Sequence, residues 1–154
     1  NKAKIEEEKL QQDPETHNFE TVTSFESPYM GDASNMSGLF HTLPLNKYKG
    51  PLEMDPNTFT LIVNYYSVLD ESTEKIKQAV VYNSPAAFTL IGNLQVIEMR
   101  FGSESYTVTR ENVEKWFGTT LSDFKDPDVF KERVQKQLKA KNFDDWVLAY
   151  TEGE

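Results

Sequence analysis

The sequence of 154 residues contains no cysteine and only two histidines. Without cysteine, the chain has no thiol catalyst, no disulfide and no zinc site with thiolate ligands. His17 and His41 have no second histidine at helical spacing, so they form no metal-binding pattern. Asp123, Asp126 and Asp128 form an acidic group, but Asp126 fits a helix cap and Asp128 fits a first-turn acid. We therefore expect no metal ion and no cofactor.

The sequence also lacks a long apolar run and a basic stripe. Polar side chains interrupt residues 79–97, so no apolar run reaches the ~18 residues that a membrane span needs. The formal net charge is −9, and the lysines within residues 131–141 alternate with Glu132 and with amides, as on a solvated helix face. Because phosphate binding depends on clustered lysine and arginine, the sequence predicts no nucleic-acid partner.

The common catalytic motifs are missing too. No serine stands in a Gly-x-Ser-x-Gly or Ser-x-x-Lys motif, and the seven glycines are scattered singly, so no phosphate-binding loop is present. His17 and His41 are the only histidines that could activate a serine. We predict no catalytic residue and expect that the chain is not an enzyme.

Residues 1–26 differ from the rest of the chain in composition. They hold three lysines against seven acidic residues, a net charge of −4, and only five sizeable apolar side chains. Burial of so little apolar surface cannot offset the entropy lost on ordering. We predict a disordered acidic tether over residues 1–26 and a single domain over residues 27–154. Because the chain begins with Asn, we expect a processed or truncated form from which any signal peptide has been removed.

Apolar side chains at helical spacing predict five helices. Asp32 or Ser34 caps the first helix, and Pro44 ends it. Ser84 and Pro85 fit the cap and the first position of a new helix, so we expect two nearly collinear helices there. The sequence leaves open whether Pro85 kinks or breaks them. The predicted helices span residues 33–43, 72–82, 85–92, 110–117 and 127–141.

Alternating apolar residues predict two hairpins and a last short strand that contains Trp146, Leu148 and Tyr150. Strands and helices do not alternate singly, which argues against a doubly wound parallel sheet. We predict an α+β fold in which an antiparallel sheet of about four strands carries helices mainly on one face. The hairpin strands are residues 51–54 with 58–67, and 96–101 with 106–109.

Four polar residues lie next to, or within, apolar sequence: Tyr29, Asp32, Asn83 and Arg110. Buried amides and charges are costly without partners, so such residues serve either the backbone or a ligand. Asp32 fits a helix cap, Asn83 a partner of the backbone, and Arg110 a partner of a carboxylate, and this structural interpretation is favoured. We keep all four as candidate ligand-binding residues.

Three segments occur in an order and at a spacing that together resemble a known family. They are Tyr29-Met-Gly-Asp-Ala-Ser-Asn with Leu43-Pro44-Leu45, Val81-Tyr-Asn-Ser-Pro-Ala-Ala-Phe-Thr-Leu-Ile-Gly-Asn93 and Tyr106-Thr-Val-Thr-Arg-Glu-Asn-Val-Glu-Lys-Trp-Phe-Gly118. Over about residues 25–135 the chain resembles the domain of unknown function 4825. The resemblance implies an extracytoplasmic domain of Gram-positive bacteria, either a small lipoprotein or the outward-facing part of a membrane protein. The family has no established activity, so the resemblance implies no functional residue.

We therefore expect a non-enzymatic binding or sensory module, held at the outer face of the cell membrane by a lipid anchor rather than by a transmembrane helix. The resemblance makes the acidic segment 1–26 look like the tether of a lipoprotein. One alternative is a cell-envelope hydrolase with Asp32, Asn83 and Arg110 as its site. Another is a structural partner of a membrane or envelope protein complex, which would recognise protein through exposed aromatics such as Trp146 and Tyr150.

Overall fold

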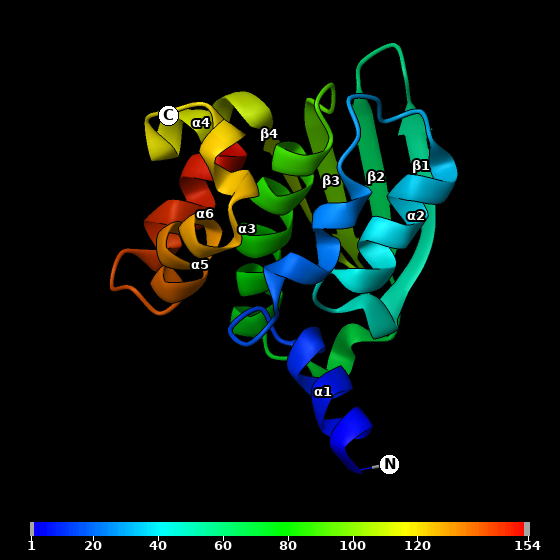
Figure 1. The fold of residues 1–154 in the computed structure, drawn as a ribbon, viewed down its shortest axis with the longest axis vertical. Coiled ribbons are helices and arrows are strands. Elements are labelled where there is room, and N and C mark those ends of the chain that lie inside the picture. Colours follow the sequence, from blue (N-terminus) through cyan, green and yellow to red (C-terminus); the bar gives the residue numbers. More distant parts are fainter. Residues whose placement is uncertain (1, 153–154) are drawn as a thin grey trace.

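The structure is a computed structural model that describes residues 2–152. A four-stranded sheet, in the order β1-β2-β3-β4, lies behind a layer of helices (Figure 1). In β2 and β3 every second residue is buried and its neighbours are only partly covered, because the helices pack on one face. The strands are β1 (Lys49–Asp55), β2 (Thr60–Tyr65), β3 (Val96–Phe101) and β4 (Glu104–Thr109).

The sheet is mixed, which corrects the prediction of a purely antiparallel sheet. The β1–β2 and β3–β4 pairs are antiparallel hairpins, as predicted, whereas β2 and β3 run parallel. Helix α3 (Thr73–Leu90) connects β2 to β3. With 18 residues it spans ~27 Å, so it carries the chain back along the whole sheet and lets β3 start at the same end as β2.

Pro85 lies inside α3 and does not break it. Proline removes one helical hydrogen bond, but residues 78–90 of α3 are buried on every side, and this packing holds the helix together. The two helices that were predicted over residues 72–92 are therefore one. A helix buried all round forms the centre of the core. It packs against α4 (Arg110–Phe117), α6 (Phe143–Glu152) and two 3₁₀ turns, η1 (Phe19–Phe25) and η4 (Leu121–Lys125).

The C-terminal part is helical throughout. The helix predicted over residues 110–117 is confirmed as α4, and it ends at Gly118, which has a φ of 73°. Helix α5 (Pro127–Arg133) is shorter than predicted, because the chain turns into the 3₁₀ turn η5 (Gln135–Gln137) after Val134.

The predicted last strand is wrong, because Trp146, Leu148 and Tyr150 belong to α6. Phe143, Trp146, Val147 and Tyr150 share one buried face at helical spacing, and Leu148 faces outward. Trp146 and Tyr150, which were expected to be exposed, are therefore in the core.

The N-terminal segment contains helix α1 (Lys2–Gln12) and the turn η1. Helix α1 has no buried residue and leads away from the body (Figure 1). Beyond it the structure differs from the predicted boundary at residue 26, because His17, Phe19 and Val22 are buried. The ring of Phe19 stacks on Phe130 with 4.0 Å between ring centroids, and this apolar contact helps to order the otherwise polar segment. The mobility of the first residues stays a prediction.

Helix α2 (Ala33–Thr42) agrees with the helix predicted over residues 33–43 and starts at an Asp32 cap. Short 3₁₀ turns, η2 (Asn46–Tyr48) and η3 (Val68–Asp70), complete the fold. Within residues 2–152, no helix has both the length and the apolar character that a membrane crossing needs.

Candidate functional site

Asp32 is a helix cap, as the sequence predicts. Its Oδ1 accepts a hydrogen bond of 3.0 Å from the backbone N–H of Asn35, at the start of α2. Tyr29 precedes it by three residues, and its side chain is 68% exposed. Tyr29 is therefore available for contact at the surface.

The Arg110 side chain closes the C-terminal end of α3. Its Nη2 donates to the carbonyl oxygens of Phe88 at 2.7 Å and Ile91 at 2.8 Å, and its Nε donates to Leu94 O at 2.8 Å. The guanidinium also lies over the Phe88 ring. Burial lowers the pKa of Arg110, and Glu114 acts in the opposite direction. A cation is favoured at a helix C-terminus, where carbonyl groups lack helical partners, so Arg110 serves the backbone.

Asn83 is fully buried, as the sequence predicts. Its Nδ2 donates a hydrogen bond of 3.1 Å to the carbonyl oxygen of Pro44, which joins α3 to the end of the Leu43-Pro44-Leu45 motif. Burial raises the pKa of the nearby Tyr65 hydroxyl, and the Asn83 amide acts in the opposite direction. Asn83 therefore lies in the core and cannot reach a ligand at the surface.

The three sequence motifs meet at the end of α3, where backbone and side chains interlock. The N–H of Ser27 donates to Leu90 O at 2.8 Å, and the N–H of Gly92 donates to Ser27 O at 2.9 Å. Asn93 Oδ1 accepts from the N–H of Met30 at 2.7 Å. A Cβ on Gly92 would lie 3.2 Å from Pro28 Cα, which is tighter than most Cβ contacts, so glycine favours this close approach. The motif residues serve this junction, and none of the four candidate residues lines the five most prominent pockets of residues 2–152.

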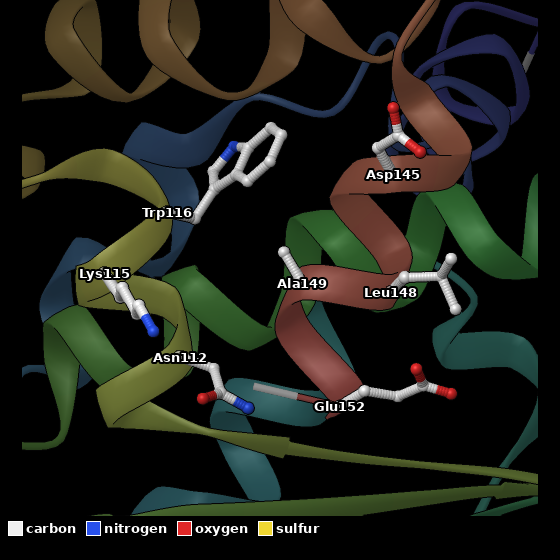
Figure 2. Close-up of a pocket in the computed structure, with 7 residues that line it drawn as sticks. All are labelled: Asn112, Lys115, Trp116, Asp145, Leu148, Ala149 and Glu152. Atoms are coloured by element: carbon white, nitrogen blue, oxygen red, sulfur yellow. The ribbon is translucent and has the colours of Figure 1, made fainter. Parts of the chain in front are cut away.

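The groove between α4 and α6 has the composition of a binding surface. Figure 2 shows Asn112, Lys115 and Trp116 on α4 opposite the side chains of α6, around a pocket of about 530 Å³. On α6 the lining residues are Asp145, Leu148, Ala149 and Glu152. They follow one another at i, i+3, i+4 and i+7, so they form a stripe along one helix face.

The floor of this groove is rigid and its rim is charged. The Trp116 ring stacks on the buried Trp146 with 5.8 Å between centroids, and Asn112 Nδ2 donates to Tyr150 O at 2.9 Å, which ties α4 to α6. Leu148 is 50% exposed. Within residues 2–152, Asp145 has no ion pair, and neither does Glu152 or Lys115.

Sequence reasoning missed this groove because residues 146–150 were taken as a strand. The signal that could have found it is the spacing of the apolar residues Phe143, Trp146, Val147 and Tyr150, which places Asp145, Leu148 and Glu152 together on the opposite face. No group of three His, Asp or Glu side chains within the described residues is arranged to hold a metal ion.

The chain was compared with known families, curated proteins and solved structures. The model of one family, described as "Domain of unknown function (DUF4825)", matches residues 22–111. No curated protein and no solved structure matches the chain significantly. The matched range covers more than half of the chain and holds all four strands with α2 and α3, which carry the interlocked motifs. The groove residues, from Asn112 onward, follow the matched range. The chain belongs to the family described as Domain of unknown function (DUF4825).

Proposed function

We propose that the chain is a non-enzymatic binding module that acts outside the cytoplasm and recognises a protein partner through the α4–α6 groove. In this proposal a lipid anchor on the N-terminal side holds it at the membrane of a Gram-positive cell. The observation that carries the binding role is the groove itself. The groove presents the half-exposed Leu148 and the ring of Trp116, and the charged residues around them make no ion pair within residues 2–152.

The position of α1 supports attachment on the N-terminal side. This helix buries none of its residues and projects from the body, with the N-terminal end farthest out. Helix α4, one wall of the groove, lies toward the other end of the long axis (Figure 1). An anchor on the N-terminal side would therefore leave the groove open to partners away from the membrane.

The charge of α6 favours a basic partner. Its residues Phe143–Glu152 include Asp144, Asp145 and Glu152 and no lysine or arginine. The stripe from Asp145 to Glu152 is ~10 Å long, about two helical turns. A short amphipathic helix with an apolar face toward Leu148 and with lysine or arginine beside the two acids would complement this surface.

The geometry gives less support to the hydrolase alternative. Asp32 caps α2 with one carboxylate oxygen, Asn83 is buried in the core, and Arg110 donates hydrogen bonds to three backbone carbonyl groups. These three side chains hold the fold together, so they are poorly placed to act on a substrate. The alternative of a structural partner in a membrane complex is close to the proposal, but its contact would be the groove and not the buried rings of Trp146 and Tyr150.

Site-specific photo-crosslinking tests this proposal. A photoreactive amino acid at position 148 of the protein, expressed in its own membrane environment, should give a discrete crosslinked product. The same probe at position 69 is the matched control, because Leu69 is 98% exposed and does not line the groove. Products of the same identity and yield from both positions, or no product from position 148, would contradict a partner in the groove.

A charge reversal tests the chemistry of the partner. Replacing Asp145 and Glu152 by lysine should reduce the crosslink from position 148 at least tenfold, since the two new positive charges would repel a basic segment. The matched control is Glu132→Lys, at an exposed position that lies outside the groove. An unchanged crosslink in the double variant would leave a groove partner but exclude a basic one.

A further inference from the structure

The N-terminal segment is attached to the body mainly through polar contacts. Residues 13–18, here called the strap, follow α1 and contact the end of α2, helix α3 and the turn η5. Gln135 Nε2 donates to Pro14 O at 2.9 Å and to His17 O at 2.7 Å. Surface pockets lie on both sides of this seam. The seam pockets involve residues 4–12 with 41–46, residues 9–13 with 45–75, and residues 10–20 with 127–135.

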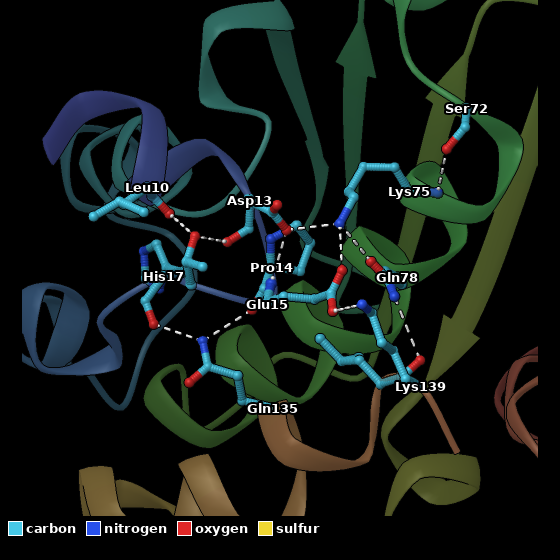
Figure 3. A network of polar contacts seen from close by, with 12 residues as sticks. Leu10, Asp13, Pro14, Glu15, His17, Ser72, Lys75, Gln78, Gln135 and Lys139 are labelled. Atoms are coloured by element: carbon cyan, nitrogen blue, oxygen red, sulfur yellow. Dashed lines mark hydrogen bonds and ion pairs between the residues drawn. The ribbon is translucent and has the colours of Figure 1, made fainter. Parts of the chain in front are cut away.

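Three ion pairs fix the middle of the strap. Lys75 Nζ lies 2.7 Å from Asp13 Oδ1 and 2.8 Å from Glu15 Oε2, and Lys139 Nζ lies 3.2 Å from Glu15 Oε1 (Figure 3). Burial alone would raise the pKa of Glu15, but its hydrogen bonds with the two lysines lower it overall. Glu15 therefore stays ionised at mildly acidic pH and keeps both lysines paired there.

His17 is the buried end of the strap, with only 2% of its surface exposed. Its Nε2 lies 2.8 Å from Thr42 O, which can only accept, so Nε2 carries the proton. Its Nδ1 lies 2.6 Å from the Tyr82 hydroxyl oxygen and accepts the hydrogen bond that this hydroxyl donates. This neutral tautomer satisfies both ring nitrogens, whereas a charged ring would leave Tyr82 without an acceptor for its O–H in this pair.

No charged side chain makes an ion pair with His17 in the described chain. Nearby polar and charged groups come from its own segment, α2, α3, α5 and the turn after α5. They are Asp13, Glu15 and Glu20 on its own segment, His41 beside Thr42 on α2, Lys75 and Tyr82 on α3, Asp128 and Lys131 on α5, and Lys139 beyond η5. A proton on the buried ring would thus meet desolvation without a carboxylate partner to compensate it.

We infer that the strap is an acid-releasable fastening: protonation of His17 frees residues 13–18 and α1 from the body, while the sheet and α3 stay folded. Release would uncover Tyr82, Thr42 O and Gln135, which the strap now contacts. Residues 13–18 precede the range matched by the family, 22–111, and Gln135 and Lys139 follow it. The strap therefore connects the segment before the matched range with the segment after it.

The size of the effect follows from proton linkage. Burial lowers the pKa of His17 from 6.5 to about 4, and the backbone of Thr42 acts in the opposite direction. Above pH 6.5 the ring is neutral whether the strap is bound or free, so pH has no effect there. Below 6.5 only the free ring takes up a proton, and each pH unit down to about 4 favours release tenfold. At pH 5 the release equilibrium is therefore about 30-fold larger than at pH 7.5.

Amide hydrogen exchange by NMR measures this release directly on the whole protein. The N–H of Leu45 donates to Gln12 O at 3.0 Å, so its protection reports whether the strap and α1 are docked. The N–H of Leu43 donates to Leu39 O within the end of α2 and serves as the internal control two residues away. After correction for intrinsic exchange, the protection factor of Leu45 should fall about 30-fold from pH 7.5 to pH 5, and that of Leu43 should stay constant.

Variants separate the role of His17 from simple loss of packing. His17→Gln should make the Leu45 protection independent of pH, while His41→Gln, at an exposed position, should keep the 30-fold change. Glu15→Gln should lower the Leu45 protection at both pH values and leave their ratio unchanged. A constant Leu45 protection in the parent protein, a parallel fall at Leu43, or a full pH response in His17→Gln would each overturn the proposal.

Discussion

At the scale of single residues, the polar side chains inside this protein are fastenings between segments that are distant in sequence. Asn83 joins α3 to Pro44, His17 joins the strap to Tyr82, and Arg110 joins α4 to the end of α3. Each pairs a side chain with a group that would otherwise be buried without a partner, which is costly. A polar residue inside an apolar segment therefore indicates a junction here.

The Asn83→Leu variant tests this at one residue. Leucine has a similar size but cannot donate to Pro44 O, so the free energy of unfolding should fall by roughly 1–3 kcal/mol. Thr89→Val is the matched control, because it removes a buried hydroxyl on the same helix that has no hydrogen-bond partner in the described chain. It should change stability by less than ~1 kcal/mol. Urea denaturation measures both, and coinciding midpoints for Asn83→Leu and the parent would contradict the fastening role.

At the scale of elements, local periodicity predicted most helices and strands but not the way they connect. Local chemistry sets several helix ends, since Asp32 and Thr109 cap α2 and α4 and Gly118 ends α4 with a positive φ. Pro85 led to the prediction of two helices, because the hydrogen bond that it removes can be seen in the sequence. The burial of α3 on every side, which stabilises the helix in spite of this loss, depends on the tertiary structure. The parallel β2–β3 pair depends on the length of α3, which returns the chain to the end where β2 starts, and the order of elements alone did not reveal this direction.

The pair Trp146→Ala and Leu148→Ala tests the assignment of α6. In the helix, Trp146 is 2% exposed and Leu148 is 50% exposed, so the two substitutions should differ strongly. We expect Trp146→Ala to cost about 3–5 kcal/mol and Leu148→Ala to stay within about 0.5 kcal/mol. A strand over 146–150 would put both side chains on one face and make both substitutions costly. Thermal and urea unfolding of the two variants decide between these arrangements.

At the scale of the whole molecule, the acidic front segment is divided into an exposed helix and a docked part. Composition averaged over residues 1–26 predicted one tether, because it could not reveal that His17, Phe19 and Val22 find partners in α3 and α5. Such partners lie more than 60 residues away in sequence, beyond the reach of any local pattern. Of the four candidate site residues, Asp32, Asn83 and Arg110 bond to backbone groups and Tyr29 is largely exposed, and a ligand-binding role for them stays a prediction.

Backbone dynamics test where this division lies. Residues 2–10 bury no side chain, so their amide order parameters should fall below about 0.6, while those of α3 should lie near 0.85. Residues 19–25 should resemble α3, because Phe19 and Val22 are buried in η1. ¹⁵N relaxation at neutral pH provides these values. Order parameters at residues 2–10 equal to those of α3 would mean that α1 is held by contacts beyond those described.

The global stability of the protein should also respond to acid through His17. The ring is neutral in the folded state, where burial lowers its pKa to about 4, whereas the unfolded chain has a pKa near 6.5. Stability is thus unaffected by this group above pH 6.5 and falls as the pH drops toward 4, by ~2 kcal/mol at pH 5. The loss stops growing once the strap opens in the folded state, since His17 is then exposed in both states. Urea unfolding at pH 7.5, 6 and 5 should show this fall in the parent and in His41→Gln but not in His17→Gln. Equal slopes in the parent and His17→Gln would show that other groups cause the acid sensitivity.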